Sequence, residues 1–149
     1  MAKRILLPLD QSVAAETVIP LVAATARGSG ATVRLVHVAP MPENLADRAG
    51  HVIAYSDQER ERLEAEAMDY LRTVELSFEG VPVECIVRFG DPAGEILHEV
   101  DSFNADLVAV TTAGLSGVSR TLFGSVAEKV FKHSEVPVML FRSGRHLSD

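Results

Sequence analysis

Residues 107–110 read Leu107-Val108-Ala109-Val110, a run of apolar side chains without polar alternation. Such a run is typical of a central strand in a parallel sheet, because helices bury both faces of that strand. Further short strand-like segments cover residues 5–9, 31–38, 81–88 and 136–141. The chain is therefore predicted to form a parallel sheet of five strands, with residues 107–110 near its centre.

Helical patterns separate these strands. Apolar residues recur at three- and four-residue steps over residues 12–27, then over 57–78, in a helix opened by Gly90-Asp91-Pro92, and over 124–133. Parallel strands need crossover connections, which are right-handed and place helices on both faces of the sheet. The pattern predicts an α/β fold over residues 1–149, a single doubly wound, five-stranded parallel open sheet that is Rossmann-like.

Composition narrows the class of protein. A length of 149 residues suits one domain, and 47% hydrophobic with 23% charged residues excludes a disordered or coiled-coil chain. The formal net charge of −7 argues against nucleic acid and anionic membranes as partners. The first residues offer too short an apolar stretch for a secretory signal, so we expect a cytoplasmic protein.

Several segments have a structural interpretation. Residues 39–56 lack a clear period and are predicted to be a loop or a mobile lid. The charged face of the helix over 57–78 is interpreted as solvated, with a partner surface as the lesser alternative. Cys85 is the lone cysteine and is expected to be a buried strand thiol, and His37 a packed histidine.

Ligands of open α/β sheets bind at the carboxyl ends of the strands, where the strand order reverses. Residues 8–12, 37–40 and the segment from Thr111 onward follow such ends. A P-loop motif is absent from the sequence, and Gly28-x-Gly30 lies between a helix and a strand, the wrong order for a dinucleotide fingerprint. The familiar phosphate motifs therefore do not apply.

A different glycine pattern remains as a candidate phosphate site. Gly114 is followed, after nine residues, by Gly124-Ser125 at the start of the last helix. A helix start favours a phosphate, because its N–H groups are unpaired and its dipole is positive there. Arg120 is the cation of the intervening loop. The alternative is that Gly124 and Ser125 only cap the helix and that Gly114 only ends a strand.

The sequence resembles the universal stress protein family over nearly the whole chain. The matching motifs are Pro8-x-Asp10-x-Ser12, Leu35-Val36-His37-Val38, Gly90-Asp91-Pro92, Ala105-Asp106-Leu107-Val108 and Gly124-Ser125-Val126-Ala127-Glu128-Lys129-Val130. Nucleotide-binding members of that family carry Gly-x-x-Gly, nine residues, and Gly-Ser/Thr. Here Thr111 replaces the first glycine and Ala113 the usual histidine.

The resemblance implies an adenine nucleotide, ATP or else AMP or ADP, as the ligand. It implies that Asp10 faces the ribose and adenine, that the Val38 main chain contacts the adenine edge, and that Gly114, Gly124 and Ser125 hold phosphates. The nucleotide-binding residues are then predicted to be Pro8, Leu9, Asp10, Val38, Thr111, Gly114, Arg120, Gly124, Ser125 and Val126.

Two of these positions remain open to other interpretations. The β-branched side chain of Thr111 could narrow the space beside the ribose, or its hydroxyl could donate to the ligand. Asp10 could bind the ligand, or it could cap the first helix together with Ser12.

The predicted function is that of a stress-response switch regulated by the nucleotide. No catalytic residue and no metal-ligand cluster is predicted from the sequence, and Mg²⁺ would come only with the phosphates. The alternatives are a nucleotide-free interaction module and a slow ATPase or phosphotransferase. A homodimer is expected through the last strand, with Val136, Val138 and Leu140 at the interface, because residues 136–141 are apolar and Pro137 suits an edge strand.

Overall fold

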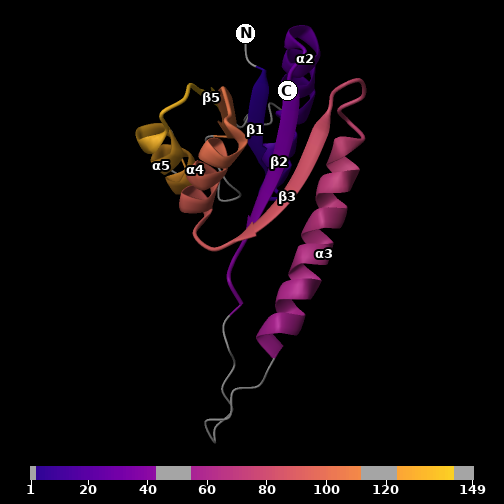
Figure 1. The fold of residues 1–149 in the computed structure, drawn as a ribbon, viewed down its shortest axis with the longest axis vertical. Helices are drawn as coiled ribbons and strands as arrows, with labels where there is room; N and C mark the ends of the chain where they lie inside the picture. Colours follow the sequence, from indigo (N-terminus) through magenta and orange to yellow (C-terminus); the bar gives the residue numbers. More distant parts are fainter. Residues whose placement is uncertain (1–2, 43–54, 112–123, 143–149) are drawn as a thin grey trace, which may run out of the picture.

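The computed structural model describes residues 3–42, 55–111 and 124–142. Strands and helices alternate along the chain (Figure 1). The elements are β1 (Arg4–Pro8), α1 (Val13–Glu16), α2 (Ile19–Ser29), β2 (Thr32–Ala39), α3 (Tyr55–Glu75), β3 (Val83–Phe89), α4 (Pro92–Phe103), β4 (Leu107–Thr111), α5 (Ser125–His133) and β5 (Val138–Phe141).

The strands form one parallel sheet in the order β3-β2-β1-β4-β5. The chain first adds β2 and β3 on one side of β1 and then returns to add β4 and β5 on the other side. The order therefore reverses between β1 and β4, and this is the position at which ligands bind in such sheets. The predicted parallel sheet of five strands is confirmed.

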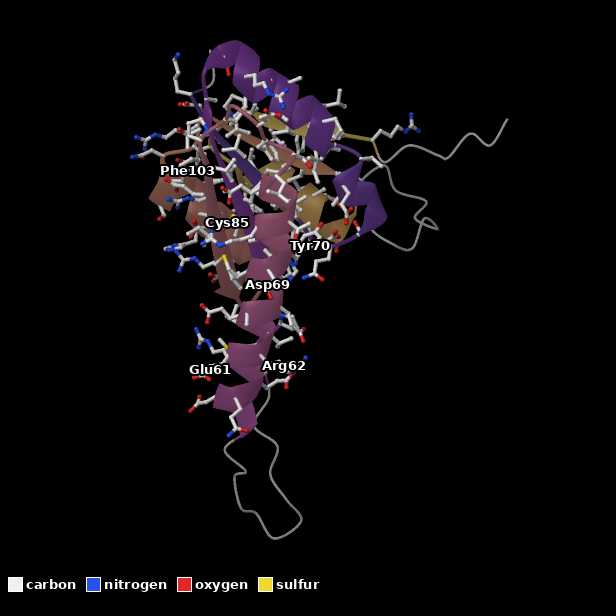
Figure 2. All side chains as sticks on the ribbon, turned by 90° about the vertical axis from the view of Figure 1, so that its right-hand side faces the viewer. Glu61, Arg62, Asp69, Tyr70, Cys85 and Phe103 are labelled. Atoms are coloured by element: carbon white, nitrogen blue, oxygen red, sulfur yellow. The ribbon has the colours of Figure 1, made fainter. Side chains whose placement is uncertain are left out.

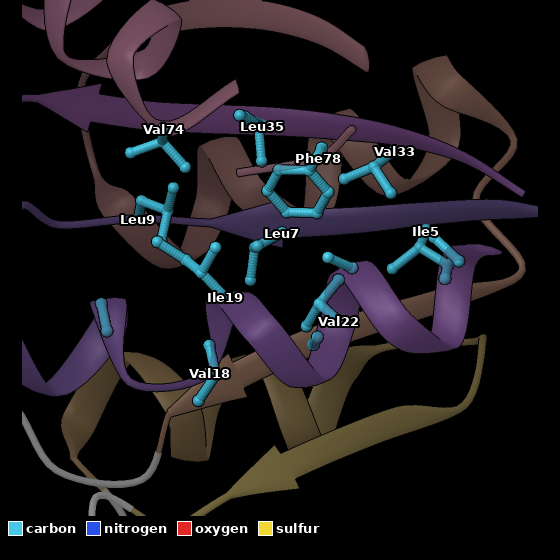
Figure 3. Packing of buried hydrophobic residues seen from close by; sticks show 14 of the residues in the cluster. Ile5, Leu7, Leu9, Val18, Ile19, Val22, Val33, Leu35, Val74 and Phe78 are labelled. Carbon is cyan, nitrogen blue, oxygen red and sulfur yellow. The ribbon is translucent and has the colours of Figure 1, made fainter. Parts of the chain in front are cut away.

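Each face of the sheet has its own hydrophobic core. On one face, α1, α2 and α3 pack over side chains such as Leu7 of β1 and Leu35 of β2 (Figure 3). On the other face, α4 and α5 pack over Leu6 of β1 and Val108 of β4, and Figure 1 shows these two helices together on one side of the sheet. Helices cover both faces, so the prediction of a doubly wound fold is confirmed.

The single helix predicted over residues 12–27 is wrong. The structure has two helices there, α1 (Val13–Glu16) and α2 (Ile19–Ser29), separated by a short turn. Pro20 lies in the first turn of α2 and has no N–H with which to continue a helix from α1. A proline fits the first turn of a helix, so the chain ends one helix and starts another.

The last strand starts two residues later than predicted, at Val138. The side chain of Ser134 accepts the N–H of Val136 at 3.1 Å and donates to the carbonyl of Val136 at 2.8 Å. These bonds hold the main chain of Val136 in a turn instead of in the sheet. Of the loop predicted over residues 39–56, Ala39 belongs to β2, residues 55–56 belong to α3, and residues 43–54 lie outside the described residues.

Asp106 joins the starts of two neighbouring strands. Its Oδ2 accepts the N–H of Lys3 at 2.7 Å and the N–H of Arg4 at 2.9 Å. These two backbone hydrogen bonds hold the pKa of Asp106 below its ordinary value. A carboxyl group whose pKa is lower in the folded state stabilises the fold above its unfolded-state pKa, and that contribution is lost as the pH falls through the folded-state pKa.

We expect Asp106→Asn to lower the midpoint of urea unfolding at about pH 7, with the difference from the wild type shrinking toward zero near about pH 2. Asn is the neutral counterpart of the protonated side chain, so the two proteins converge once Asp106 is protonated. The exposed Asp101 gives the control, Asp101→Asn. A difference at neutral pH that persists unchanged in acid would show that the charge of Asp106 is not what stabilises the fold.

Candidate functional site

A cavity of ≈ 240 Å³ lies at the carboxyl ends of the strands on either side of the strand-order reversal. Its lining comes from the ends of β1, β2 and β4 and from the first residues of α4 and α5, with Ala15 of α1. The volume is somewhat below the usual range for small-molecule pockets, which starts at about 300 Å³. The fold thus forms a hollow at the place where ligands of this architecture bind.

The cavity brings together most of the predicted nucleotide-binding residues, namely Pro8, Leu9, Asp10, Val38, Thr111, Gly124, Ser125 and Val126. Gly114 and Arg120 lie outside the described residues. The sequence reasoning missed the other lining residues, which are Ala15, Val36, Pro92, Ile96, Val110 and Ala127. Pro92 and Ile96 could have been predicted, because Gly90-Asp91-Pro92 also follows the carboxyl end of a strand.

The first turn of α5 presents backbone donors to this cavity. Its first intrahelical hydrogen bond runs from the N–H of Glu128 to the carbonyl of Gly124 at 2.9 Å. The N–H groups of Ser125, Val126 and Ala127 precede that bond and so have no partner within the helix. Among the described residues no side chain caps this helix end. These donors, at the positive end of the helix dipole, are suited to an anion.

Asp10 and Ser12 shape the turn that follows β1. The Oδ1 of Asp10 accepts the N–H of Ser12 at 2.9 Å, and the Oγ of Ser12 accepts the N–H of Ala15 at 3.0 Å. Ser12 therefore caps α1, which fits the capping alternative that the sequence left open beside ligand binding by Asp10. Gln11 between them has a φ of 67°, a left-handed conformation that is uncommon for a residue with a Cβ. Asp10 is exposed, and within the described part of the chain its Oδ2 has no hydrogen-bond partner.

The main chain of Val38 faces the space beyond the end of β1. The N–H of Leu9 donates to the carbonyl of Val36 at 2.8 Å, so the main chain of Val36 faces β1. Alternate residues of a strand direct their N–H and C=O groups toward the same neighbour. Because β1 ends at Pro8, the corresponding groups of Val38 face the cavity that Val38 lines. They offer one donor and one acceptor side by side.

His37 has a structural partner beside the cavity. Its Nδ1 donates to the carbonyl of Leu9 at 2.8 Å, which requires the proton on that nitrogen. The bond joins β2 to the end of β1 and agrees with the prediction of a packed histidine.

Thr111 is the last residue of β4 and lies in register with Phe141 of β5. Among the described residues, the non-glycine residues with a positive φ are Gln11 and Asn104. Thr111 therefore has ordinary extended backbone, and a threonine at the position where the family motif has glycine causes no backbone strain. Its side chain still lines the cavity, so the choice between a steric role and a hydroxyl contact concerns the side chain alone.

Cys85 is not suited to nucleophilic chemistry. It packs against the core on the α3 face and donates to Glu75 at 3.4 Å. Burial, followed by the effect of Glu75, raises its pKa to about 11, so the thiol is protonated at neutral pH. Cys85 is a strand thiol as predicted, but it is half-buried and not fully buried.

Tyr70 of α3 (Figure 2) is likewise held as a neutral group. It donates to Glu16 at 3.1 Å, and burial, followed by the charges of Glu16 and Asp10, raises its pKa above the ordinary value. Figure 2 also shows Glu61 and Arg62 on the part of α3 that projects away from the sheet. Both are exposed, as expected of a solvated face.

The described residues contain no group of three or more His, Cys, Asp or Glu side chains that could hold a metal ion. Searched over the same part of the chain, no helix is long and apolar enough to cross a membrane.

Comparison with known proteins relates the whole chain to one family. The sequence profile of the universal stress protein family matches residues 1–142. A universal stress protein of Thermus aquaticus, encoded in the QAH/OAS sulfhydrylase 3' region, is 33% identical over 145 residues, which are 95% of this chain and 100% of that protein. Universal stress protein MJ0531 of Methanocaldococcus jannaschii is 36% identical over 84 residues, which are 55% of this chain and 49% of that protein.

Several solved structures share the fold of this chain. The hypothetical protein MJ0577 superposes with a TM-score of 0.82 at 27% identity, covering 96% of this chain and 97% of that one. A universal stress protein solved in complex with cAMP has a TM-score of 0.64 at 18% identity, with 96% and 98% of the two chains covered. One from Archaeoglobus fulgidus in complex with dAMP has a TM-score of 0.58 at 21% identity, with 93% and 96% covered. With the profile matched over nearly its full length, the chain belongs to the universal stress protein family.

Proposed function

We propose that this protein binds an adenine nucleotide, ATP or AMP, in the cavity at the carboxyl ends of β1 and β4, and acts in the stress response as a switch regulated by that ligand. The observation that carries the proposal is that two different sets of backbone hydrogen-bonding groups line the same cavity. The main chain of Val38 offers a donor and an acceptor, and the first turn of α5 offers N–H groups that have no partner within the helix.

The two ends of the cavity suit the two ends of a nucleotide. An adenine ring presents adjacent donor and acceptor atoms on its edge, which match the N–H and C=O of Val38. The apolar side chains of Val36, Ile96 and Val110 suit the faces of a ring. A phosphate suits the start of α5. Two proteins of the same fold are known in complex with cAMP and dAMP, which favours an adenine nucleotide as the ligand class.

Asp10 must lie away from the phosphates for this arrangement to work, because like charges repel. Its exposed carboxylate suits the hydroxyl groups of a ribose, to which Oδ2 can accept while Oδ1 stays bonded to Ser12. Mg²⁺ would enter with the phosphates of the ligand. The sequence has no P-loop lysine to stabilise phosphoryl transfer, so a switch is favoured over a fast enzyme.

Native mass spectrometry of the purified protein tests the proposal directly. Co-purifying ATP or AMP supports the switch. An empty site that also fails to take up added ATP or AMP in calorimetric titration contradicts it. ADP together with phosphoserine would instead favour the slow ATPase or phosphotransferase.

The role of Asp10 can be tested by Asp10→Ala. We expect affinity for AMP to fall about tenfold, since a hydrogen bond to a charged group is lost. The free energy of unfolding should also fall by about 1 kcal/mol, since the turn before α1 loses its acceptor. Ser12→Ala is the matched control, because it removes the cap of α1 but keeps the carboxylate. Unchanged AMP affinity in Asp10→Ala would show that Asp10 only stabilises the turn before α1 and does not bind the ligand.

A second candidate function is a nucleotide-free homodimeric interaction module. The observation that favours it is the open edge of the sheet at β5, which pairs with β4 and with no other described strand. An unpaired apolar edge is a template for association with a second chain.

A further inference from the structure

A buried carboxylate on α4, one turn from the cavity-lining Ile96, is not among the residues that the proposed function uses so far. Glu99 of α4 has 0% of its surface exposed. Its Oε1 accepts from Arg34 Nη1 of β2 at 2.8 Å, and its Oε2 accepts from Arg88 Nε of β3 at 2.6 Å, with a further contact to Arg88 Nη2. We call Arg34, Arg88 and Glu99 the Glu99 network. It joins one helix to two neighbouring strands.

Arg34 of the network has two further partners, Glu84 and Phe103. Arg34 also pairs with Glu84 of β3, with Nη2 2.7 Å and Nε 2.9 Å from the same oxygen. Its guanidinium lies 4.3 Å from the ring centre of Phe103, one turn beyond Glu99 on α4 and labelled in Figure 2. Burial alone would lower the pKa of Arg34, but its hydrogen bonds to Glu84 and Glu99 raise it above the ordinary value. Arg34 therefore stays charged and paired.

The elements that the network joins include two that form a wall of the cavity. Val36 and Val38, two and four residues after Arg34 on β2, line it, and so does Ile96, one turn before Glu99 on α4. Arg88 is in register with Val38 across the β2–β3 pair. The ion pairs therefore lie directly beside the wall that faces the ligand.

Stability alone does not explain why the carboxylate of Glu99 is buried beside two partly buried arginines. Desolvation of the charges offsets most of their attraction, and apolar side chains of similar size often stabilise a fold as well or better. What the charged groups add is direction, because a carboxylate bonded by two guanidinium groups accepts only a narrow range of positions. Apolar packing of α4 on the sheet would allow a small slide that these bonds prevent.

We propose that Glu99 is a positioning residue: by bonding Arg34 and Arg88 it fixes α4 against β2 and so sets the width of the cavity around the nucleoside part of the ligand. The inference rests on the proposed function. It assigns Glu99 no contact with the ligand. The three residues of the network lie on β2, β3 and α4 and none on α5, so we expect the nucleoside part to be affected and the phosphate contacts at the start of α5 to stay as they are.

The test is Glu99→Gln, titrated calorimetrically with adenosine and with AMP. We expect both affinities to fall by about the same factor, about tenfold, which is the lower range for a misfit of one methylene in an apolar pocket. The ratio of AMP to adenosine affinity then stays at the wild-type value. Circular dichroism must show that the variant is fully folded, because a partly unfolded population would lower both affinities by the same factor. Asp101→Asn is the matched control, since it removes the same charge from an exposed position of the same helix, and its affinities should not change.

If Glu99→Gln does not fold, Arg88→Met gives the same test, because Glu99 keeps Arg34 as a partner and neutral adenosine does not sense the lost charge. Wild-type adenosine affinity in a folded Glu99→Gln or Arg88→Met overturns the inference. Should the wild type bind neither adenosine nor AMP, the proposed function fails, and the positioning role is then read from the methyl NMR signals of Ile96 and Val38 without ligand. Shifted signals in Glu99→Gln but not in Asp101→Asn support it, and unshifted signals overturn it.

Discussion

Gly124→Val is expected to weaken binding of AMP and ATP by about 100-fold, or about 3 kcal/mol, while binding of adenosine changes little. The backbone donors of the first turn of α5 are available because the residue that precedes them has no side chain. A branched side chain at position 124 would crowd the approach of a phosphate to these donors. The charge-assisted hydrogen bonds to the phosphate would be lost, but the contacts to the base would remain.

The fold should survive this change. Gly124 has a φ of −67° and a ψ of 159°, a conformation open to any residue, and valine at a helix cap costs a modest amount of stability. Gly28→Val is the matched control, because it makes the same substitution in α2, away from the cavity lining, where nothing lies within 4 Å of the added Cβ. Calorimetric titration with circular dichroism checks both variants. If the folded Gly124→Val variant binds AMP with wild-type affinity, the start of α5 does not bind the phosphate.

Val138→Lys is expected to separate the proposed homodimer, raising its dissociation constant by at least about 100-fold, because two like charges would meet across a two-fold axis. The carbonyl of Pro137 accepts the N–H of Val108 of β4 at 3.1 Å, so Pro137 faces the sheet. By the alternation of a strand, the N–H and C=O groups of Val138 and Leu140 then face the open edge, where a second β5 can pair with them.

The side chains of Val136, Val138 and Leu140 are half-buried against the core under α4 and α5, so the variant must be shown to be folded. Lysine at position 138 can keep its stem on that core and its ammonium in water. Val138→Thr, which is branched and uncharged, is the control and should stay dimeric. Light scattering at micromolar concentration gives the result. A monomeric wild type, or a dimeric Lys variant, would contradict the interface at β5.

Local patterns predicted the elements of this fold well, and their errors have local causes. The run at residues 107–110 is β4, with neighbours on both sides as expected of a central strand. The prediction of one helix over residues 12–27 was wrong because Pro20 lies in the first turn of a new helix, and the spacing of apolar residues carries no information about such a break. The last strand began late because the side chain of Ser134 binds the main chain of Val136, a contact that only the folded chain shows.

Part of the candidate site could also be predicted from the sequence. Motif residues such as Asp10 and Gly124 were found because the carboxyl ends of parallel strands meet at one edge of a sheet. Pro92 and Ile96 were missed because the strand end before Gly90-Asp91-Pro92 was not counted among the ends that meet at the site. Glu99 was not singled out from the sequence, because its burial depends on the position of α4 over the two strands that carry Arg34 and Arg88.

The sequence by itself determined that strands and helices alternate and that the sheet is parallel, because the periodicity of apolar residues records which side of each element is buried. Only the tertiary structure decided the strand order β3-β2-β1-β4-β5, which places the reversal and its cavity between β1 and β4 and leaves β5 at an edge. Strand order depends on which buried surface packs against which, and contacts between residues as far apart as Glu99 and Arg34, 65 positions in the chain, are not visible in local patterns.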